Sequence, residues 1–165
     1  MGESGRTLLN SFIDSFISIF EDTDNLVKMS EKYYYFDTSI WIDIYDKRGY
    51  NGEIAMKLMQ RIIVENFSVI YSDMNIIEFK DVGFSDYEIN QMLSTAKPDN
   101  IKLVHPTKEQ IIEAKRLARQ RDVPKGDALH AVLARDHGAQ IVATDLKDFN
   151  KLKDITTMKK PEELI

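Results

Sequence analysis

The chain has 165 residues, of which 43% are hydrophobic and 30% are charged, and it contains no cysteine. This length suits a single domain with one sizeable core, and the lack of cysteine excludes disulfides, zinc–thiolate sites and thiol catalysis. The formal net charge of −5 argues against a uniformly basic nucleic-acid binder, although bound cations can still bring a phosphodiester to an acidic site. A cysteine-free chain suits a reducing cytoplasm, which is the compartment we expect.

The N-terminal residues 1–32 are expected to form an amphipathic helical extension. Their apolar side chains recur at steps of three and four, which predicts one apolar helix face. The residues on this face are Leu8, Leu9, Phe12, Ile13, Phe16, Ile17 and Phe20. Such a face packs either on its own domain or on a second chain. Asp14 and Glu21 enclose a charge-free run that is too short to span a membrane or to direct export, so we expect no membrane attachment.

Beyond residue 32, short apolar runs alternate with helical patterns. The expected strands are Tyr33–Phe36, Phe67–Tyr71, Ile101–Val104, Ala139–Ala143 and Ile155–Thr157. Strands separated by helices indicate right-handed crossovers and a mostly parallel sheet. The nearly continuous apolar character of the runs indicates that both faces of this sheet are covered. We therefore expect one α/β domain over residues 33–165.

Helical signals occupy the segments between these strands. One apolar face is expected from Ile54, Ala55, Leu58, Met59, Ile62 and Ile63. Ser85 with Glu88, and Thr107 with Gln110, have the spacing of capping boxes, which mark the start of two further helices. These patterns place helices before and after the third strand.

Acidic residues follow several of the expected strands, where ligands of open parallel sheets bind. Asp37 follows the first strand, and Glu78 lies in the helical segment after the second. Asp145 follows the fourth strand, with Asp148 three residues further on. Asp127 is expected to cap a helix that ends before Gly138. Each acid could have a purely structural role, but converging carboxylates repel one another unless they bind protons or cations. Mg²⁺ and Mn²⁺ prefer such oxygen ligands.

Four segments in order, "FDTSIWIDIY", "IIEF", "GDALHA" and "VATDLKDF", resemble the PIN-domain nuclease family, as does the C-terminal "KKPEELI". The resemblance covers residues 33–165 and implies a three-layer sandwich of helices around a central, mostly parallel sheet. It also implies an acidic quartet of Asp37, Glu78, Asp127 and Asp145.

Further positions match supporting residues of the same family. Asp148 matches an additional acid of the last motif, and is therefore a further metal-ligand candidate. Thr38 or Ser39, together with Thr144, match hydroxyl positions that orient the acids, and Thr144 is the stronger match than Ser39. Lys125 and Lys147 are the basic residues nearest to the acids in sequence, and are candidates for binding the substrate.

The resemblance implies a ribonuclease that hydrolyses single-stranded RNA with Mg²⁺ or Mn²⁺, using one cation or two about 3.5–4 Å apart. Asp37 and Asp145 are expected as direct ligands, with Glu78 and Asp127 completing the site. Some family members are toxins held by an antitoxin and others process RNA, and the sequence does not choose between these roles. The resemblance also implies a homodimer.

Two other classes of function remain open from the sequence. The first is a PIN-like scaffold that binds RNA or protein without cleaving, although the chain retains all four acids. The second is a receiver-like or phosphatase-like domain with Asp37 as phosphoryl acceptor, but position 39 is Ser where such phosphatases have an acid. The three histidines, His105, His130 and His137, are assigned no function.

Overall fold

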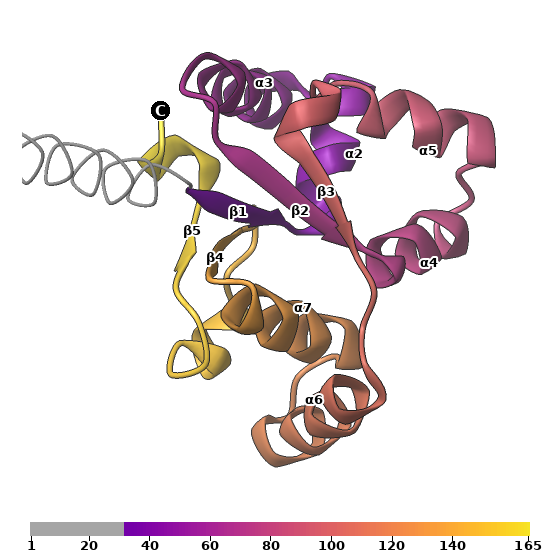
Figure 1. Ribbon diagram of the computed structural model, residues 1–165, viewed down its shortest axis with the longest axis vertical. Coiled ribbons are helices and arrows are strands. Elements are labelled where there is room, and N and C mark those ends of the chain that lie inside the picture. The colour runs from indigo at the N-terminus through magenta and orange to yellow at the C-terminus, as the bar shows by residue number, and fades with distance from the viewer. Residues whose placement is uncertain (1–31) are drawn as a thin grey trace, which may run out of the picture. The chain divides into compact units, whose positions relative to one another are not determined.

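The computed structural model describes residues 32–165, so the helix predicted within residues 1–32 lies outside the described residues. The described part contains a five-stranded parallel sheet with the order β3-β2-β1-β4-β5 (Figure 1). The strands are β1 Tyr33–Phe36, β2 Ser68–Ser72, β3 Ile101–Val104, β4 Ala139–Val142 and β5 Met158–Lys159. The predicted α/β sandwich around a parallel sheet is confirmed.

Helices cover both faces of the sheet, with α3 on one side and α7 on the other (Figure 1). The α-helices are α2 Thr38–Asp46, α3 Gly49–Val64, α4 Asp73–Asp81, α5 Asp86–Leu93, α6 Lys108–Arg121 and α7 Lys125–Asp136. Three short 3₁₀ turns are η1 Pro98–Asn100, η2 Phe149–Leu152 and η3 Pro161–Glu163. Between residues 32 and 165, no helix has the length and apolar character needed to cross a bilayer.

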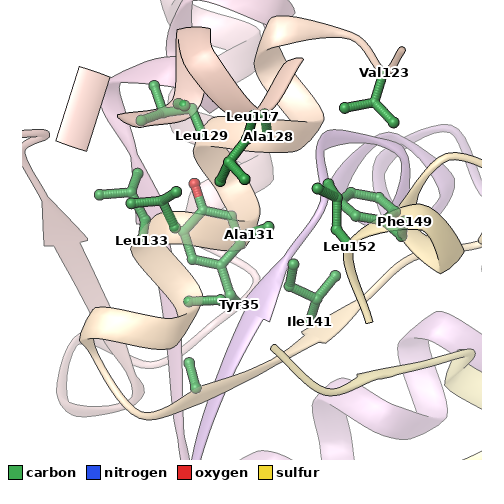
Figure 2. Packing of buried hydrophobic residues seen from close by; sticks show 14 of the residues in the cluster. Tyr35, Leu117, Val123, Ala128, Leu129, Ala131, Leu133, Ile141, Phe149 and Leu152 are labelled. Atoms are coloured by element: carbon green, nitrogen blue, oxygen red, sulfur yellow. The ribbon is translucent and has the colours of Figure 1, made fainter. Parts of the chain in front are cut away.

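The central strand β1 supplies side chains to two separate cores. Successive strand residues point to opposite faces, so Tyr34 and Phe36 pack with Trp41 of α2 on one side, while Tyr35 points to the other. Figure 2 shows Tyr35 beside Ala131 of α7 within this second core. All three strand side chains are at most 1% exposed, so β1 is held rigidly from both faces.

The end of β1 lies at the point where the chain order of the sheet reverses. From β1 the chain continues to β2 on one side, whereas β4 lies on the other. The backbone N–H of Asp37 donates to the carbonyl of Val142 at 2.9 Å, which joins the carboxyl ends of β1 and β4. The Asp37 side chain also caps α2 by accepting from the Ser39 N–H. Asp37 therefore stands in the crevice where open α/β sheets bind ligands.

Both predicted capping boxes are present. The Ser85 hydroxyl accepts from the Glu88 N–H at the start of α5, and Thr107 accepts from Gln110 at the start of α6. In each box the longer side chain, Glu88 or Gln110, accepts a hydrogen bond from the backbone N–H of the capping residue. Two backbone donors at the start of the helix are therefore satisfied. Gly138 follows α7 with a φ of 61°, in agreement with its predicted role in ending that helix.

Two local predictions are wrong. Helix α7 begins at Lys125 and its N-cap is Pro124, so Asp127 lies in the first turn instead of capping the helix. The last strand is Met158–Lys159 and not Ile155–Thr157. Ile155 packs against the core beside η2, and only the residues after it reach the hydrogen-bonding register of β4. Short edge segments such as β5 carry little periodic signal, because two residues cannot show an alternation.

Helix α4 offers a direct test of this packing. Phe79 is fully buried and Ile77 is 51% exposed on the same helix. We expect Phe79→Ala to lower the free energy of unfolding by about 3–5 kcal/mol, because it leaves a cavity, and Ile77→Ala to lower it by less than about 1 kcal/mol. Urea unfolding of both variants provides the measurement. Equal losses would contradict the orientation of α4.

Candidate active site

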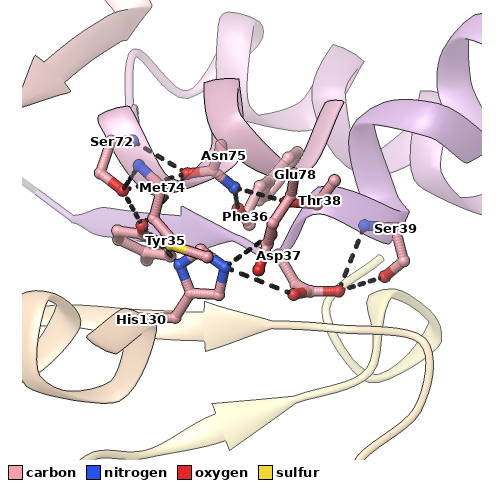
Figure 3. Close-up of polar contacts among 10 residues, drawn as sticks. All are labelled: Tyr35, Phe36, Asp37, Thr38, Ser39, Ser72, Met74, Asn75, Glu78 and His130. Carbon is pink, nitrogen blue, oxygen red and sulfur yellow. Dashed lines mark hydrogen bonds and ion pairs between the residues drawn. The ribbon is translucent and has the colours of Figure 1, made fainter. Parts of the chain in front are cut away.

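Two carboxylates and one imidazole converge beyond the ends of β1 and β2. Asp37, Glu78 and His130 each direct one possible ligand atom into a group whose atoms lie within 4.8 Å of one another. The Nε2 atom of His130 lies 3.0 Å from Glu78 Oε2 and 3.9 Å from Asp37 Oδ1. Figure 3 shows the imidazole between the Tyr35 hydroxyl and these two carboxylates. The cluster thus joins three elements that are far apart in sequence. Asp37 is the N-cap of α2, Glu78 lies within α4 and His130 lies within α7.

Hydroxyl groups hold both carboxylates. The Thr38 hydroxyl donates to Glu78 Oε2, and its oxygen accepts from the Asn75 amide at 3.1 Å. Asp37 Oδ2 accepts from the Ser39 hydroxyl at 2.5 Å and from the Ser39 N–H at 3.2 Å. These contacts leave Asp37 Oδ1 directed toward His130. Each acid is therefore oriented by a residue of the first turn of α2.

A buried hydrogen-bond chain lies behind His130. The Tyr35 hydroxyl lies 2.7 Å from His130 Nδ1, 2.6 Å from Ser72 Oγ and 3.1 Å from Asn75 Oδ1. Asn75 Oδ1 also accepts from the Ser72 N–H, as part of the capping box of α4. His130, Tyr35, Ser72 and Asn75 all have an exposed fraction of zero. The imidazole is therefore held at both nitrogens, with a fully buried partner at Nδ1 and the partly exposed Glu78 at Nε2.

The cluster raises the pKa of His130 and lowers the pKa of Glu78. Burial by itself lowers the pKa of His130, but the hydrogen bond to Glu78 and the charges of Glu78, Asp37 and Asp127 raise it overall. For Glu78, burial acts to raise the pKa, and the hydrogen bond and charge of His130 together with the Thr38 hydroxyl lower it overall. The pair thus favours a charged imidazole against an ionised carboxylate.

Asp127 behaves differently from Glu78. Burial, followed by the negative charges of Asp37, Asp148 and Glu78, raises the pKa of Asp127 to about 6, while His130 opposes this rise. Burial and the neighbouring acids therefore disfavour the ionised form of Asp127, which holds a proton at mildly acidic pH.

Gly126 allows Glu78 to approach α7. A Cβ atom placed at position 126 would clash with Glu78 Oε1 and lie 3.3 Å from Met74 Cε. Both neighbours are ends of side chains, but the Glu78 carboxylate is held by Thr38 and His130. The glycine of the "GDALHA" motif is therefore required by the position of the Glu78 carboxylate.

The other acids expected from the sequence lie around this cluster. Asp127 and Asp148 are close enough for their charges to interact, as the pKa of Asp127 records. Asp145 is exposed in the segment after β4 and accepts from the Lys147 N–H at 2.8 Å. Among residues 32–165, the group with ligand atoms within 4.8 Å includes neither Asp127, Asp145 nor Asp148. Lys125 and Lys147 are both exposed, Lys125 at the first residue of α7.

The hydroxyl that contacts Asp37 belongs to Ser39, whereas the sequence favoured Thr144 over Ser39. The Thr144 hydroxyl instead donates to Asp43 Oδ2 at 3.0 Å. The Asp43 side chain is 7% exposed, so this contact connects α2 to the segment that carries Asp145 from inside the protein. Thr144 thus helps to hold the segment after β4 against α2, and its side-chain hydrogen bond is with Asp43 and not with the clustered acids.

The sequence reasoning did not assign His130, Tyr35 or Asn75 to the site. One signal was available for His130, because residues three apart on a helix share a face and His130 follows Asp127 by three positions. No signal was available for Tyr35, since its place within an apolar strand indicates core packing. Its hydroxyl becomes part of the site only because α7 packs over that face of β1.

The family model of the PIN domain matches residues 34–155 of this chain. The chain belongs to the PIN domain family. PIN domains are generally nucleases, and the matched span contains every residue of the cluster described above. A sequence search of curated proteins gave no match.

Several solved structures share this PIN fold. A chain of VapBC2 from Rickettsia felis, bound to a promoter DNA fragment, aligns with a TM-score of 0.57 at 16% identity, covering 78% of this chain and 98% of that one. VapBC-1 from nontypeable Haemophilus influenzae gives 0.57 at 15% identity, covering 79% and 98%. A toxin–antitoxin complex from Klebsiella pneumoniae gives 0.53 at 17%, covering 78% and 97%. The TM-scores establish the shared fold, and identities this low show no more than that.

The residues of this PIN domain suit a divalent cation. Asp37 and Glu78 present carboxylate oxygens to one point, and burial together with the charges of Asp37, Asp148 and Glu78 raises the pKa of Asp127. A hard cation prefers oxygen ligands and relieves such repulsion. The donor set therefore fits the metal use that is typical of PIN nucleases.

The close contact at Gly126 predicts that Gly126→Ala changes the free energy of unfolding in opposite directions in the wild-type and Glu78→Ala proteins. Gly126→Ala should lower the free energy of unfolding by about 1–3 kcal/mol, because the new Cβ displaces the held Glu78 carboxylate. In the Glu78→Ala background the same change should raise it by up to about 1 kcal/mol, because alanine is the better helix former. Urea unfolding of the four proteins measures both effects. A similar loss in both backgrounds would show that the clash is not with Glu78.

The raised pKa of Asp127 predicts a pH dependence of stability in the absence of metal. Because the folded value of about 6 exceeds the unfolded value of 3.8, this group contributes stability below pH about 4 that is lost as the pH rises through 6. Asp127→Asn should therefore stabilise the protein at pH 8 and not at pH 4. The difference between pKa values of 3.8 and about 6 bounds the gain at about 3 kcal/mol, and screening by water at this partly exposed group reduces it to about 1 kcal/mol.

The measurement is urea unfolding at the two pH values with EDTA present throughout. The exposed Asp99 provides the control, since Asp99→Asn should leave the difference between pH 4 and pH 8 unchanged. An Asp127→Asn variant that is equally stable relative to wild type at both pH values would contradict the predicted repulsion.

Proposed function

We propose that this PIN domain is a metal-dependent endoribonuclease that hydrolyses phosphodiester bonds in single-stranded RNA. The observation that carries the proposal is the convergence of Asp37 and Glu78 in the crevice beyond β1 and β4, with Asp127 destabilised by the same negative charge. A polyanionic substrate can enter such a site only if cations offset the acids. Clustered acids at this place are of little use to a passive binder of RNA.

The proposed cofactor is Mg²⁺ or Mn²⁺, held by Asp37 and Glu78, with Asp127, Asp145 and Asp148 completing the surroundings. When bound, a divalent cation activates water for attack and offsets the charge of the phosphoryl group and leaving oxygen. The exposed position of Asp145 leaves it free to turn toward the cluster from the segment after β4.

The remaining roles belong to residues of the chain itself. Ser39 and Thr38 orient the carboxylates of Asp37 and Glu78 through the hydrogen bonds described above. Asp127, with a pKa of about 6, is suited to accept a proton from water near neutral pH. Lys125 and Lys147 are exposed beside these acids in sequence and are proposed to contact the phosphates that flank the cleaved bond.

The biological setting that we propose is a toxin–antitoxin pair acting in the cytoplasm. The support is the fold shared with chains of VapBC2 from Rickettsia felis and of a toxin–antitoxin complex from Klebsiella pneumoniae. In this setting the chain would form a homodimer and be held inactive by a small antitoxin protein.

The activity itself can be tested directly. Purified protein should cleave a fluorescent single-stranded RNA when Mn²⁺ or Mg²⁺ is present, and EDTA should stop the cleavage. Asp37→Asn should lower the rate by about a hundredfold or more, because it removes a charged ligand of the proposed cation. Gel analysis of the products measures both effects.

The matched control lies on the same helix. Asp46 is an exposed acid at the end of α2 that pairs with Arg48, so Asp46→Asn should retain the wild-type rate. A protein that binds the RNA but leaves it intact with either metal would support the scaffold function in place of the nuclease. Cleavage that is unaffected by EDTA would rule out the metal mechanism.

A further inference from the structure

We propose that His130 is a direct ligand of the divalent cation, so that the ion is held by two carboxylates and one imidazole nitrogen. This inference rests on the proposed function and refines it, because it changes the ligand set from oxygen alone to mixed oxygen and nitrogen. The three ligands would be Asp37, Glu78 and His130, which come from the N-cap of α2 and from within α4 and α7.

The positions of the three atoms suit a single ion. Ligand bonds of about 2.1 Å at right angles place two ligand atoms about 3 Å apart. His130 Nε2 and Glu78 Oε2 are separated by 3.0 Å, and His130 Nε2 and Asp37 Oδ1 by 3.9 Å. The hydrogen bond from Nε2 to Glu78 therefore joins the same two atoms that a cation would join. A cation can replace its proton without a change of rotamer.

The second nitrogen of His130 has the environment of a metal-bound histidine. Metal-ligating imidazoles generally donate their other N–H to an acceptor that fixes the tautomer and the ring. Here Nδ1 can donate to the Tyr35 hydroxyl at 2.7 Å, which in turn can donate to Asn75 Oδ1 at 3.1 Å. Each hydrogen in this chain has an acceptor, and a cation that replaces the Nε2 proton would bind the lone pair of that nitrogen beside the carboxylates.

Burial distinguishes this arrangement from a surface ion pair. His130 is fully buried, whereas the Asp37 and Glu78 side chains are 18% and 24% exposed. The imidazole thus forms the floor of the cluster, and the two carboxylates form its solvent-facing side. A cation entering from solvent meets the carboxylates first and the nitrogen last.

A nitrogen ligand has a consequence for the choice of metal. Imidazole is a ligand mainly of transition-metal ions. Both proposed ions prefer oxygen, but Mn²⁺, as the transition metal, accepts imidazole more readily than Mg²⁺ does. The wild-type protein should therefore bind Mn²⁺ more tightly than Mg²⁺, and loss of the imidazole should weaken Mn²⁺ binding more than Mg²⁺ binding.

The experiment is pulsed electron paramagnetic resonance of the full-length protein loaded with Mn²⁺ alone. We expect electron spin-echo modulation from a directly coordinated ¹⁴N nucleus, replaced by ¹⁵N modulation when the protein is made with ¹⁵N-histidine. Mn²⁺ that binds without histidine nitrogen coupling overturns this inference but leaves the metal-dependent nuclease intact. Absence of Mn²⁺ binding overturns both.

Variants provide a second measurement by titration calorimetry. Tyr35→Phe keeps the buried ring and removes only the hydroxyl that orients His130, and should weaken Mn²⁺ binding by about tenfold or more. Tyr34→Phe, its neighbour on the opposite face of β1, should leave the affinity unchanged. His130→Gln should abolish the nitrogen modulation, and His105→Gln, on an exposed residue paired with Asp73, should retain it. Full modulation in His130→Gln would overturn the assignment.

Discussion

Negative charge confined to one crevice is the constraint on which this site depends. Asp37, Glu78 and Asp127 are brought together where β1 and β4 end, and each is removed from full contact with water. Hydroxyl groups hold the side chains of the first two, and the hydrogen bonds of Glu78 to the buried imidazole and to Thr38 favour the ionised form of Glu78. For Asp127, burial and the charges of the neighbouring acids outweigh the opposing effect of His130, so its pKa rises. A site arranged in this way is most stable when a cation or a proton supplies the missing positive charge.

The scaffold converts this charge cluster into a defined geometry. β1 is clamped between two cores, and the residue that follows it cannot move without disturbing the hydrogen bond from Asp37 to Val142. Strand ends are therefore precise places for functional groups, since backbone pairing and side-chain packing fix them together. Glu78 comes from α4, which follows the end of β2, and His130 comes from α7, and Gly126 lets the two helices approach closely enough for these side chains to meet.

Tyr35 connects the core to the chemistry of the site. Its ring belongs to the hydrophobic cluster on the α7 face of the sheet, while its hydroxyl belongs to the polar chain behind His130 (Figures 2 and 3). Burial raises the pKa of this phenol, so the hydroxyl stays protonated and can act as both donor and acceptor. The fold thus positions the imidazole with a residue that also fills the core. A change in the packing of Tyr35 would therefore displace His130 and, through it, the contact with Glu78.

The sequence by itself determined the alternation of strands and helices, the capping boxes of α5 and α6, and the acids that follow β1, β2 and β4. These features depend on local periodicity and on residues close together in the chain, which is why they could be read in advance. The tertiary structure alone decided that His130 and Tyr35 join the site, that Ser39 and not Thr144 contacts Asp37, and that Asp145 remains exposed. The contacts of Tyr35 with His130 and of Thr144 with Asp43 join segments separated by more than ninety residues, so they depend on how α7 packs over β1 and on how the segment after β4 meets α2. No local pattern contains that information.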